Sequence, residues 1–354
     1  MVSLQDIATI NPKSDPLQNT FIYIDLEAVE KGELRKIQEI MREEAPSRAQ
    51  RVIDNNDILF QCVRPYQKNN YIHRILNTSN QQWVASTGYA QIRTTELPNY
   101  IYHLLNTDEF NRKVMVRCTG SSYPAINSED LATIHLYYTP DKKEQLKISR
   151  LLDLLDKRIA TQNKIIDKLQ SLIKGIAQHC IKESTSGNTY VKLGDICQIT
   201  TGKLDANAQV DNGIYPFFTC AEQPFKIDSF AFDTEALLIS GNGANLGYIN
   251  YYKGKFNAYQ RTYVLDLFSE NIQYIKWALK VLLPKRIAIE KSSSNTPYIV
   301  LSTLTDLRLP IPCKSKQSFI ANLMQSLERK LSNQIAQYDS YNYLKQYLLR
   351  QMFI

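Results

Sequence analysis

The chain contains an internal repeat, which restricts the folds open to it. The segment VSLQDIATI at residues 2–10 returns as VKLGDICQI at residues 191–199, with Val, Leu, Asp, Ile and the final Ile in the same places. Farther along, an apolar helical pattern that starts at Ile148 returns from Ile320, at a shift of 172 residues. The repeat predicts two strand-rich modules, each followed by a long helix, with internal pseudo-twofold symmetry. Such chains usually bind a two-sided object, and duplex DNA is the commonest one.

Length and composition indicate a folded protein with several structural units. A length of 354 residues exceeds one ordinary core, and 44% hydrophobic with 22% charged residues is typical of a folded chain. The net charge of +7 is compatible with a polyanionic partner but is weak support for one. The six cysteines form no CxxC pair, so we expect reduced thiols in a cytoplasm and no metal site. We also expect no secretory signal and no membrane span.

The chain is expected to fold as an α+β protein in four segments. A first mixed module covers residues 1–140, and a central helix covers residues 141–182. A linker and a second mixed module follow at residues 183–312, and a distal helix occupies residues 313–354. Prolines punctuate the end of each module, where the helical pattern begins.

Runs of β-branched and aromatic residues predict strands in the first module. These strands lie at residues 21–25, 57–63 and 82–93. Short helices are expected at residues 100–106 and 109–116.

The central helix carries an apolar seam whose spacing alternates between three and four residues. This heptad pattern predicts packing along another helix, and the distal helix repeats the seam in a less apolar form, interrupted at Lys345. The two helices are therefore expected to form an antiparallel coiled coil. The predicted seam residues are Leu152, Leu155, Ile159, Gln162, Ile166, Leu169, Ile173, Ile176, Ile320, Leu327, Leu331, Gln334, Leu344 and Leu348.

Two glutamines, Gln162 and Gln334, occupy the same heptad position near the middle of their helices. In an antiparallel pair they would lie close together and form a polar layer that fixes the register. Alternatively, both side chains point outward at the edge of the seam. The sequence favours neither arrangement.

Sequence patterns of nucleotide and metal chemistry are missing. No GxxxxGK[ST] loop is present, and the glycines of GNGANLG at residues 241–247 lack dinucleotide-loop spacing. A tight turn after a strand at residues 236–240 is the better interpretation of that segment. The four histidines are scattered, without an evident triad. We therefore expect a binding protein with no catalytic residues.

Several motifs resemble one family. The segments VRPYQKNN at residues 63–70 and WVASTGYAQI at residues 83–92 resemble the target-recognition domain of type I restriction–modification specificity subunits. The segment at residues 237–265 resembles another subtype of that domain, and TPDKKEQLKISRLLDLLDKRI at residues 139–159 resembles the opening of the family's central helix. The order of module, helix, module and helix matches the family over nearly the whole chain.

The resemblance implies a non-catalytic subunit that reads a split DNA sequence. It implies two methyltransferase subunits and, in the full complex, two restriction subunits. Adenine would be methylated from S-adenosylmethionine at the methyltransferase, while ATP and Mg²⁺ would serve the restriction partner. No cofactor would bind this chain. Half-sites about one DNA turn apart, roughly 34 Å, would leave a spacer of about 5–8 base pairs.

Base reading requires donors and acceptors on loops at one edge of each module. Two polar segments, TGSSYP at residues 119–124 and SSSNTP at residues 292–297, occupy equivalent places and are expected to meet phosphates. The predicted DNA-contacting residues are Gln61, Arg64, Tyr66, Lys68, Asn69, Ser86, Thr87, Tyr89, Ser121, Ser122, Lys203, Asn242, Asn245, Tyr259, Gln260, Arg261, Ser293 and Asn295. For any one of them, the alternative is a solvated or purely structural side chain.

Two other functions stay open. The chain could serve a methylation-only complex, which the sequence does not distinguish from a restriction complex. It could also be a coiled-coil scaffold that binds protein and does not contact DNA.

Overall fold

The computed structural model describes residues 1–75, 81–184, 189–290 and 298–353. It divides into two compact units, each described here by itself. Unit 1 comprises Met1–Asn163 and Ala336–Ile354, and unit 2 comprises Lys164–Ile335. Each unit therefore contains half of α5 (Lys142–Glu183) and half of α8 (Lys314–Met352). The predicted division into modules and separate helices stays a prediction.

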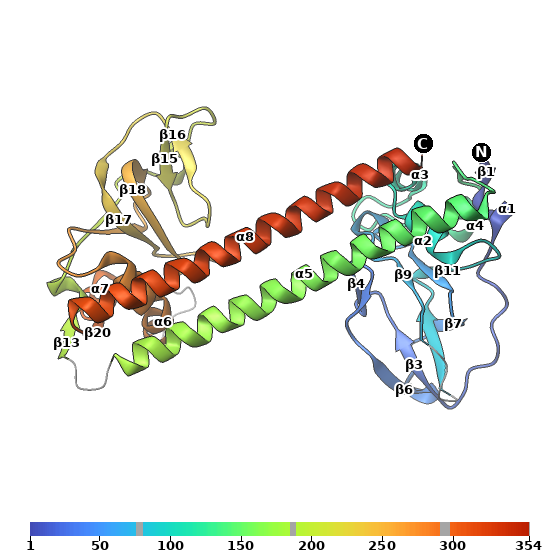
Figure 1. The fold of residues 1–354 in the computed structure, drawn as a ribbon, viewed down its shortest axis with the longest axis horizontal. Helices are drawn as coiled ribbons and strands as arrows, with labels where there is room; N and C mark the ends of the chain where they lie inside the picture. The colour runs from blue at the N-terminus through green and yellow to red at the C-terminus, as the bar shows by residue number, and fades with distance from the viewer. Residues whose placement is uncertain (76–80, 185–188, 291–297, 354) are drawn as a thin grey trace. The chain divides into compact units, whose positions relative to one another are not determined.

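Unit 1 contains two four-stranded sheets (Figure 1). The first has the order β6-β3-β10-β7, formed by Gln38–Met41, Thr20–Ile24, Gln82–Ser86 and Ala49–Ile53. The second has the order β2-β11-β8-β9, formed by Ala8–Ile10, Tyr89–Thr94, Ile58–Gln61 and Tyr71–Ile72. Two strand pairs complete the unit: β1 with β12 (Val2–Ser3, His135–Leu136) and β4 with β5 (Val29–Glu30, Glu33–Leu34).

Short helices surround these sheets. They are α1 (Leu4–Ile7), α2 (Pro98–Leu105), α3 (Asp108–Arg117) and α4 (Ser128–Ala132), with 3₁₀ turns η1 (Arg42–Glu44) and η2 (Pro65–Gln67). α2 and α3 confirm the two predicted short helices. Ile101, Leu104 and Phe110 belong to the same core cluster as Phe60 of β8, so these helices cover the second sheet.

The single strand predicted at residues 82–93 is wrong, because the segment forms two strands in different sheets. β10 pairs with β3 and β7, whereas β11 pairs with β2 and β8. The chain changes sheets at Thr87 and Gly88. A Cβ atom on Gly88 would lie 2.9 Å from Leu26 Cδ1, so alanine here would require the Leu26 side chain to shift.

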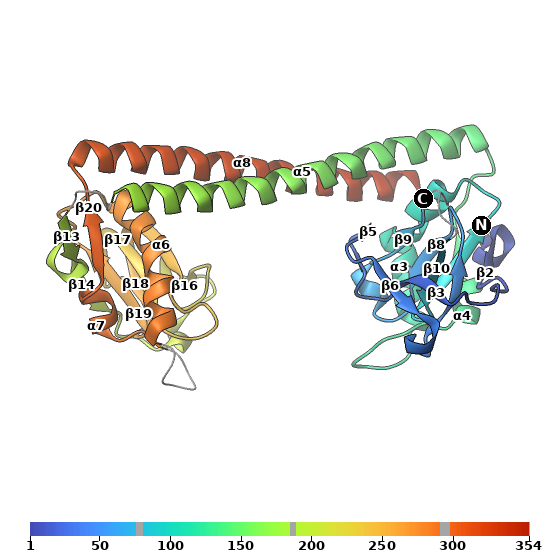
Figure 2. The same ribbon diagram turned by 90° about the horizontal axis from the view of Figure 1, so that it is seen from below.

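Unit 2 contains one six-stranded sheet of order β14-β19-β17-β18-β15-β16 (Figure 2). Its strands are Gln198–Thr201, Thr262–Asp266, Phe232–Ser240, Ile249–Ala258, Tyr215–Phe218 and Phe225–Ile227. A separate pair joins β13 (Thr189–Lys192) to β20 (Arg308–Ile311). The unit also contains α6 (Ile272–Glu290), α7 (Leu301–Thr305), η3 (Leu193–Asp195) and η4 (Ala206–Ala208). Apolar residues of α6, α5 and α8 share one core cluster with Leu237 and Leu265 of the sheet.

The repeated sequence forms equivalent junctions in the two units. In unit 1, β1 pairs with the strand that precedes α5, and the Leu4 N–H donates to the Ile134 carbonyl at 3.0 Å. In unit 2, β13 pairs with the strand that precedes α8, and the Leu193 N–H donates to the Leu307 carbonyl at 2.9 Å. The repeat thus closes each module where its long helix begins.

A buried glutamine braces the start of each long helix. Gln145 is 0% exposed and donates to Glu96 Oε2 at 2.8 Å and to the Thr139 carbonyl at 2.8 Å. Glu96 also pairs with Lys142. Because both donors are on α5 and Glu96 precedes α2, the brace fastens the helix to its module.

Unit 2 repeats this brace with the shift of 172 residues seen in the sequence. Gln317 is 1% exposed and donates to Glu270 Oε2 at 2.6 Å and to the Pro312 carbonyl at 2.9 Å. Lys314 pairs with the same Glu270 carboxylate at 2.8 Å.

The two long helices pack antiparallel within each unit, which confirms the predicted helix pair and the α+β class. In unit 1, Asp156 of α5 pairs with Lys345 of α8 at 2.5 Å, and Leu152 shares a cluster with Leu349. Lys345 therefore occupies the interface as an ion-pair partner. Leu344 is 44% exposed, so the structure contradicts its place in the seam.

In unit 2, the core cluster unites Leu169 and Ile173 of α5 with Ile320 and Met324 of α8. Ile176, Leu327 and Leu331 pack against it. Of the remaining seam residues, Gln162, Ile166 and Leu152 are buried, while Leu155, Ile159, Gln334 and Leu348 are half-buried. The juxtaposition of Gln162 and Gln334 stays a prediction, because the two residues belong to different units.

Candidate nucleic-acid interface

Two loops of unit 1 form one polar edge. The first contains Arg64 and the second is the TGSSYP segment at residues 119–124. A β-bridge joins Val63 to Ala125, and the Arg64 N–H donates to the Pro124 carbonyl at 2.7 Å. The Arg64 guanidinium lies over the Tyr123 ring at 4.2 Å, and Tyr123 is 64% exposed. Tyr123 was not among the predicted contacts. The only signal for it in the sequence was its place in the TGSSYP segment.

The backbone of the first loop is strained. Arg64 and Lys68 have φ values of 55° and 52°, and they flank the η2 turn. A residue with a Cβ atom pays about 1–2 kcal/mol in this left-handed region. Such strain concentrates at binding and catalytic sites. Ser121 and Ser122 are exposed beside the turn, and Tyr66 within it is 50% exposed.

Three predicted contacts of this unit lie in its interior, so the structure contradicts them as DNA contacts. Gln61, Ser86 and Tyr89 are 2%, 3% and 0% exposed. The Tyr89 hydroxyl donates to the Asp25 carbonyl at 3.3 Å, and burial raises its pKa. Ser86 Oγ accepts from the Gly88 N–H at 3.2 Å. These side chains stabilise the sheets and turns.

Three others are partly buried or already engaged. Lys68 Nζ pairs with Asp108 at 2.8 Å, and Asn69 Oδ1 accepts from the Lys31 N–H at 3.0 Å. Thr87 is half-buried, and its N–H donates to the Arg48 carbonyl at 2.9 Å. Asn69 Nδ2 and the remaining donors of the Lys68 ammonium stay available while these contacts are kept.

Four loops of unit 2 converge in the same manner. The Gln260 N–H donates to the Leu204 carbonyl at 2.9 Å, and the Tyr259 N–H donates to the Phe218 carbonyl at 2.9 Å. The Gly241 N–H donates to the Arg261 carbonyl at 2.8 Å. These bonds bring the segments that follow β14, β15, β17 and β18 together into one loop edge of unit 2.

Exposed polar side chains mark this edge. Lys203, Gln260 and Arg261 are exposed, while Asn242, Asn245 and Tyr259 are half-buried. Asn245 Nδ2 donates to the Cys220 carbonyl at 3.0 Å, and Cys220 Sγ lies 3.0 Å from Asn242 Oδ1. The predicted contacts Ser293 and Asn295 lie outside the described residues.

The tight turn predicted for GNGANLG is confirmed. Gly243 and Gly247 have φ values of +78° and +81°, which favour glycine. A Cβ atom on Gly241 would lie 2.5 Å from the Arg261 carbonyl oxygen. The turn therefore approaches the Arg261 loop at a distance that only glycine allows.

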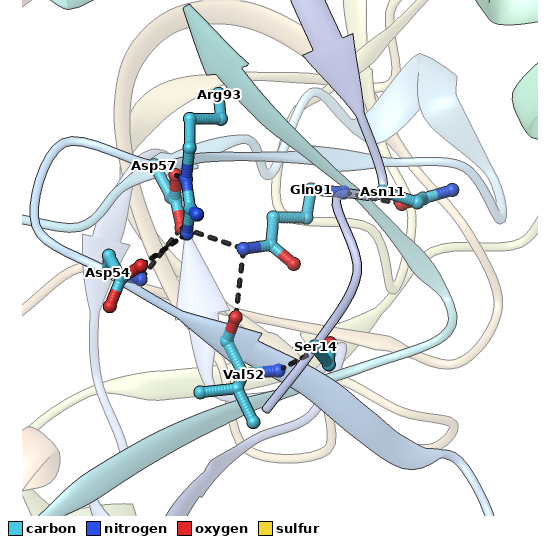
Figure 3. A network of polar contacts seen from close by, with 7 residues as sticks. All are labelled: Asn11, Ser14, Val52, Asp54, Asp57, Gln91 and Arg93. Atoms are coloured by element: carbon cyan, nitrogen blue, oxygen red, sulfur yellow. Dashed lines mark hydrogen bonds and ion pairs between the residues drawn. The ribbon is translucent and has the colours of Figure 1, made fainter. Parts of the chain in front are cut away.

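A buried carboxylate in unit 1 is structural (Figure 3). Asp57 is 1% exposed and accepts from Arg93 Nε at 2.8 Å and from Gln91 Nε2 at 2.7 Å. Gln91 Nε2 also donates to the Val52 carbonyl at 2.9 Å, which links the two sheets. The hydrogen bond to Asp57 raises the pKa of the Arg93 guanidinium. Both carboxylate oxygens of Asp57 therefore accept from side chains of β11, which ties this strand to the segment before β8.

Among the described residues, no three His, Cys, Asp or Glu side chains gather as a metal site would require. Within the same residues, no helix is long and apolar enough to cross a membrane.

Comparisons with known proteins point to one family. A family model described as "Type I restriction modification DNA specificity domain" matches residues 1–171 and 185–338. The Escherichia coli type I restriction enzyme EcoDI specificity subunit is 44% identical over 137 residues, which cover 39% of this chain and 30% of that protein. The putative type I specificity subunit S.MgeORF438P of Mycoplasma genitalium is 21% identical over 276 residues, 72% of this chain and 70% of that protein.

Solved structures show the same fold. The M. genitalium type I restriction–modification S subunit aligns with 100% of this chain and 95% of its own, with a TM-score of 0.68 and 16% identity. A chain from a study of assembly and conformational transition of the type I R–M system aligns with 99% of this chain and 96% of its own, with a TM-score of 0.63 and 22% identity. Since the family model matches most of the chain in two segments, the protein belongs to the type I restriction–modification DNA specificity domain family.

Proposed function

We propose that this chain is the DNA sequence-specificity subunit of a type I restriction–modification complex and has no catalytic activity of its own. The observation that carries the proposal is the pair of loop edges, one in each unit, within two segments that match the specificity-domain family. Each edge offers an exposed or half-exposed arginine, Arg64 or Arg261, together with hydroxyl and amide groups. Arginine is the usual partner of guanine in the major groove, and amides pair with adenine.

The target should be bipartite and asymmetric. Unit 1 presents its loops from two four-stranded sheets, whereas unit 2 presents them from one six-stranded sheet. Since the two frameworks and their loops differ, the two half-sites should differ in sequence. The repeated junctions support two half-sites read in opposite orientations, separated by about 5–8 base pairs.

The partners should be two methyltransferase subunits and, for cleavage, two restriction subunits. S-adenosylmethionine would bind the methyltransferase, and ATP with Mg²⁺ the restriction subunit. In unit 1, Leu151 and Leu154 of α5 are 44% and 64% exposed, beside the exposed cations Lys147 and Arg150. Such a mixed apolar and basic face would suit a protein partner.

Mapping of methylated adenines in the native genome, with and without this chain, tests the proposal. We expect a split motif whose methylation is lost when the chain is deleted. In a footprint, the chain with its methyltransferase should protect two separated patches of DNA. A coiled-coil scaffold predicts no protection, and one continuous methylated motif would contradict the bipartite target.

A further inference from the structure

The side chain of Gln61 is buried beneath the loop that contains Arg64. Gln61 ends β8 and is 2% exposed. Its Oε1 accepts from the Asn69 N–H at 3.1 Å, and its Nε2 donates to Gln67 Oε1 at 2.9 Å. Gln61 thus connects the strand to an exposed residue of the η2 turn.

This pair of hydrogen bonds determines which way both amides face. A backbone N–H can only donate, so the oxygen of the Gln61 amide must face Asn69. Its nitrogen then faces Gln67, and Gln67 must turn its own oxygen inward to accept. The orientation of an exposed amide is therefore set by a main-chain donor in the interior.

A second amide series holds Gln61 in place. The Gln61 N–H donates to Asn70 Oδ1 at 2.8 Å, and Asn70 Nδ2 donates to Asn106 Oδ1 at 3.0 Å. Asn106 Nδ2 in turn donates to the Tyr102 carbonyl at 2.7 Å. Each donor meets an acceptor, so a single arrangement of these amides satisfies the series from α2 to β8.

Gln67 is left with an exposed amide edge. No described residue hydrogen-bonds to its Nε2, and its Oε1 keeps a second lone pair. One donor and one acceptor side by side match N7 and N6 of adenine in the major groove. We propose that Gln67 reads an adenine in the half-site bound by unit 1, and that Gln61 positions it. This inference rests on the proposed DNA-reading function.

The test uses this chain purified with its methyltransferase subunit. Dissociation constants are measured for duplexes in which each base pair of the native target is replaced in turn. Gln67→Ala should lower discrimination at a single A·T pair by about 10- to 100-fold. Gln38→Ala, at an exposed glutamine of β6, is the matched control and should change no position.

Gln61→Met separates positioning from contact. This variant keeps the side-chain volume but cannot orient Gln67, so it should weaken discrimination at the same base pair by a smaller factor. The double variant Gln61→Met/Gln67→Ala should lose no more discrimination than Gln67→Ala, because Gln61 acts through Gln67.

The outcomes separate the two proposals. If Gln67→Ala changes no position, or weakens all positions equally, the assignment of Gln67 is wrong while the DNA-reading function stands. If the native complex shows no preference for any sequence, the proposed function itself fails. Loss of folding in Gln61→Met would still leave the assignment to be decided by Gln67→Ala and its control.

Discussion

At the residue scale, His73 makes unit 1 sensitive to acid. Its side chain is 1% exposed, with the ring 4.9 Å from that of Trp83, and burial lowers its pKa to about 4. The unfolded histidine would titrate near 6.5. Protonation therefore favours the unfolded chain, so stability is fully present above pH 6.5 and is lost as the pH falls toward 4. The loss amounts to about 3 kcal/mol at most.

Urea unfolding between pH 7 and pH 4.5 checks this prediction. In a Trp277→Phe background, Trp83 is the single remaining tryptophan and its fluorescence reports on unit 1. His73→Phe should reduce the pH dependence, because the aromatic volume stays and the titrating group is gone. Parallel profiles for the two proteins would count against the prediction.

The sequence was least informative about which single side chains lie at the surface of the candidate site. Arg64 and Arg261 were placed on loops by their motifs, and the structure finds them there. Gln61 and Tyr89 were misjudged because all four residues of β8 and the first four of β11 are buried. A strand covered on both faces lacks the alternation that separates inner from outer side chains. Gln67 was missed because the orientation of its amide is set by a hydrogen bond from Gln61, which the sequence does not show.

At the element scale, two glycines should respond to alanine in opposite ways. A Cβ atom on Gly202 would lie 1.9 Å from the Ala258 carbonyl oxygen, where main chain meets main chain. Gly202→Ala should therefore displace the loops of unit 2 and destabilise it by several kcal/mol. On the exposed face of α5, a Cβ atom on Gly175 would meet nothing within 4 Å. Gly175→Ala should stabilise the chain by about 0.5–1 kcal/mol.

Chemical unfolding of both variants, followed through Trp277 in a Trp83→Phe background, measures these effects in unit 2. A neutral Gly202→Ala would mean that the β14 and β18 loops can separate without loss. The glycine is the only feature of the sequence that indicates the close approach of these loops. The long helices, in contrast, were predictable because a heptad period persists over many turns and depends on local spacing alone.

At the scale of the whole molecule, the two loop edges should act independently. Arg64→Ala should weaken reading of one half-site only, and Arg261→Ala the other. The two arginines belong to different units and share no interaction partner among the described residues, so their effects on binding free energy should add in the double variant. Competition binding with duplexes altered in one half-site measures the effect of each substitution on the binding free energy. A double variant that departs clearly from additivity would indicate that the edges are coupled.

The parts of the architecture that occur twice could be predicted from the internal repeat of the sequence. The shift of 172 residues between Gln145 and Gln317 reflects two braces with the same donors and acceptors. The frameworks of the modules were not predictable, because four-stranded and six-stranded sheets arise from pairings between distant short strands. Those pairings follow from packing, which a single sequence does not display.

The braces have a consequence for how such a chain can change over generations. Each long helix begins against the same trio of glutamine, glutamate and lysine, and none of these residues belongs to the loops that contain Arg64 or Arg261. A lineage could alter the loops of one unit while the other unit and both junctions remain intact. A new DNA sequence preference would then arise in one half-site at a time, independently of the other half-site.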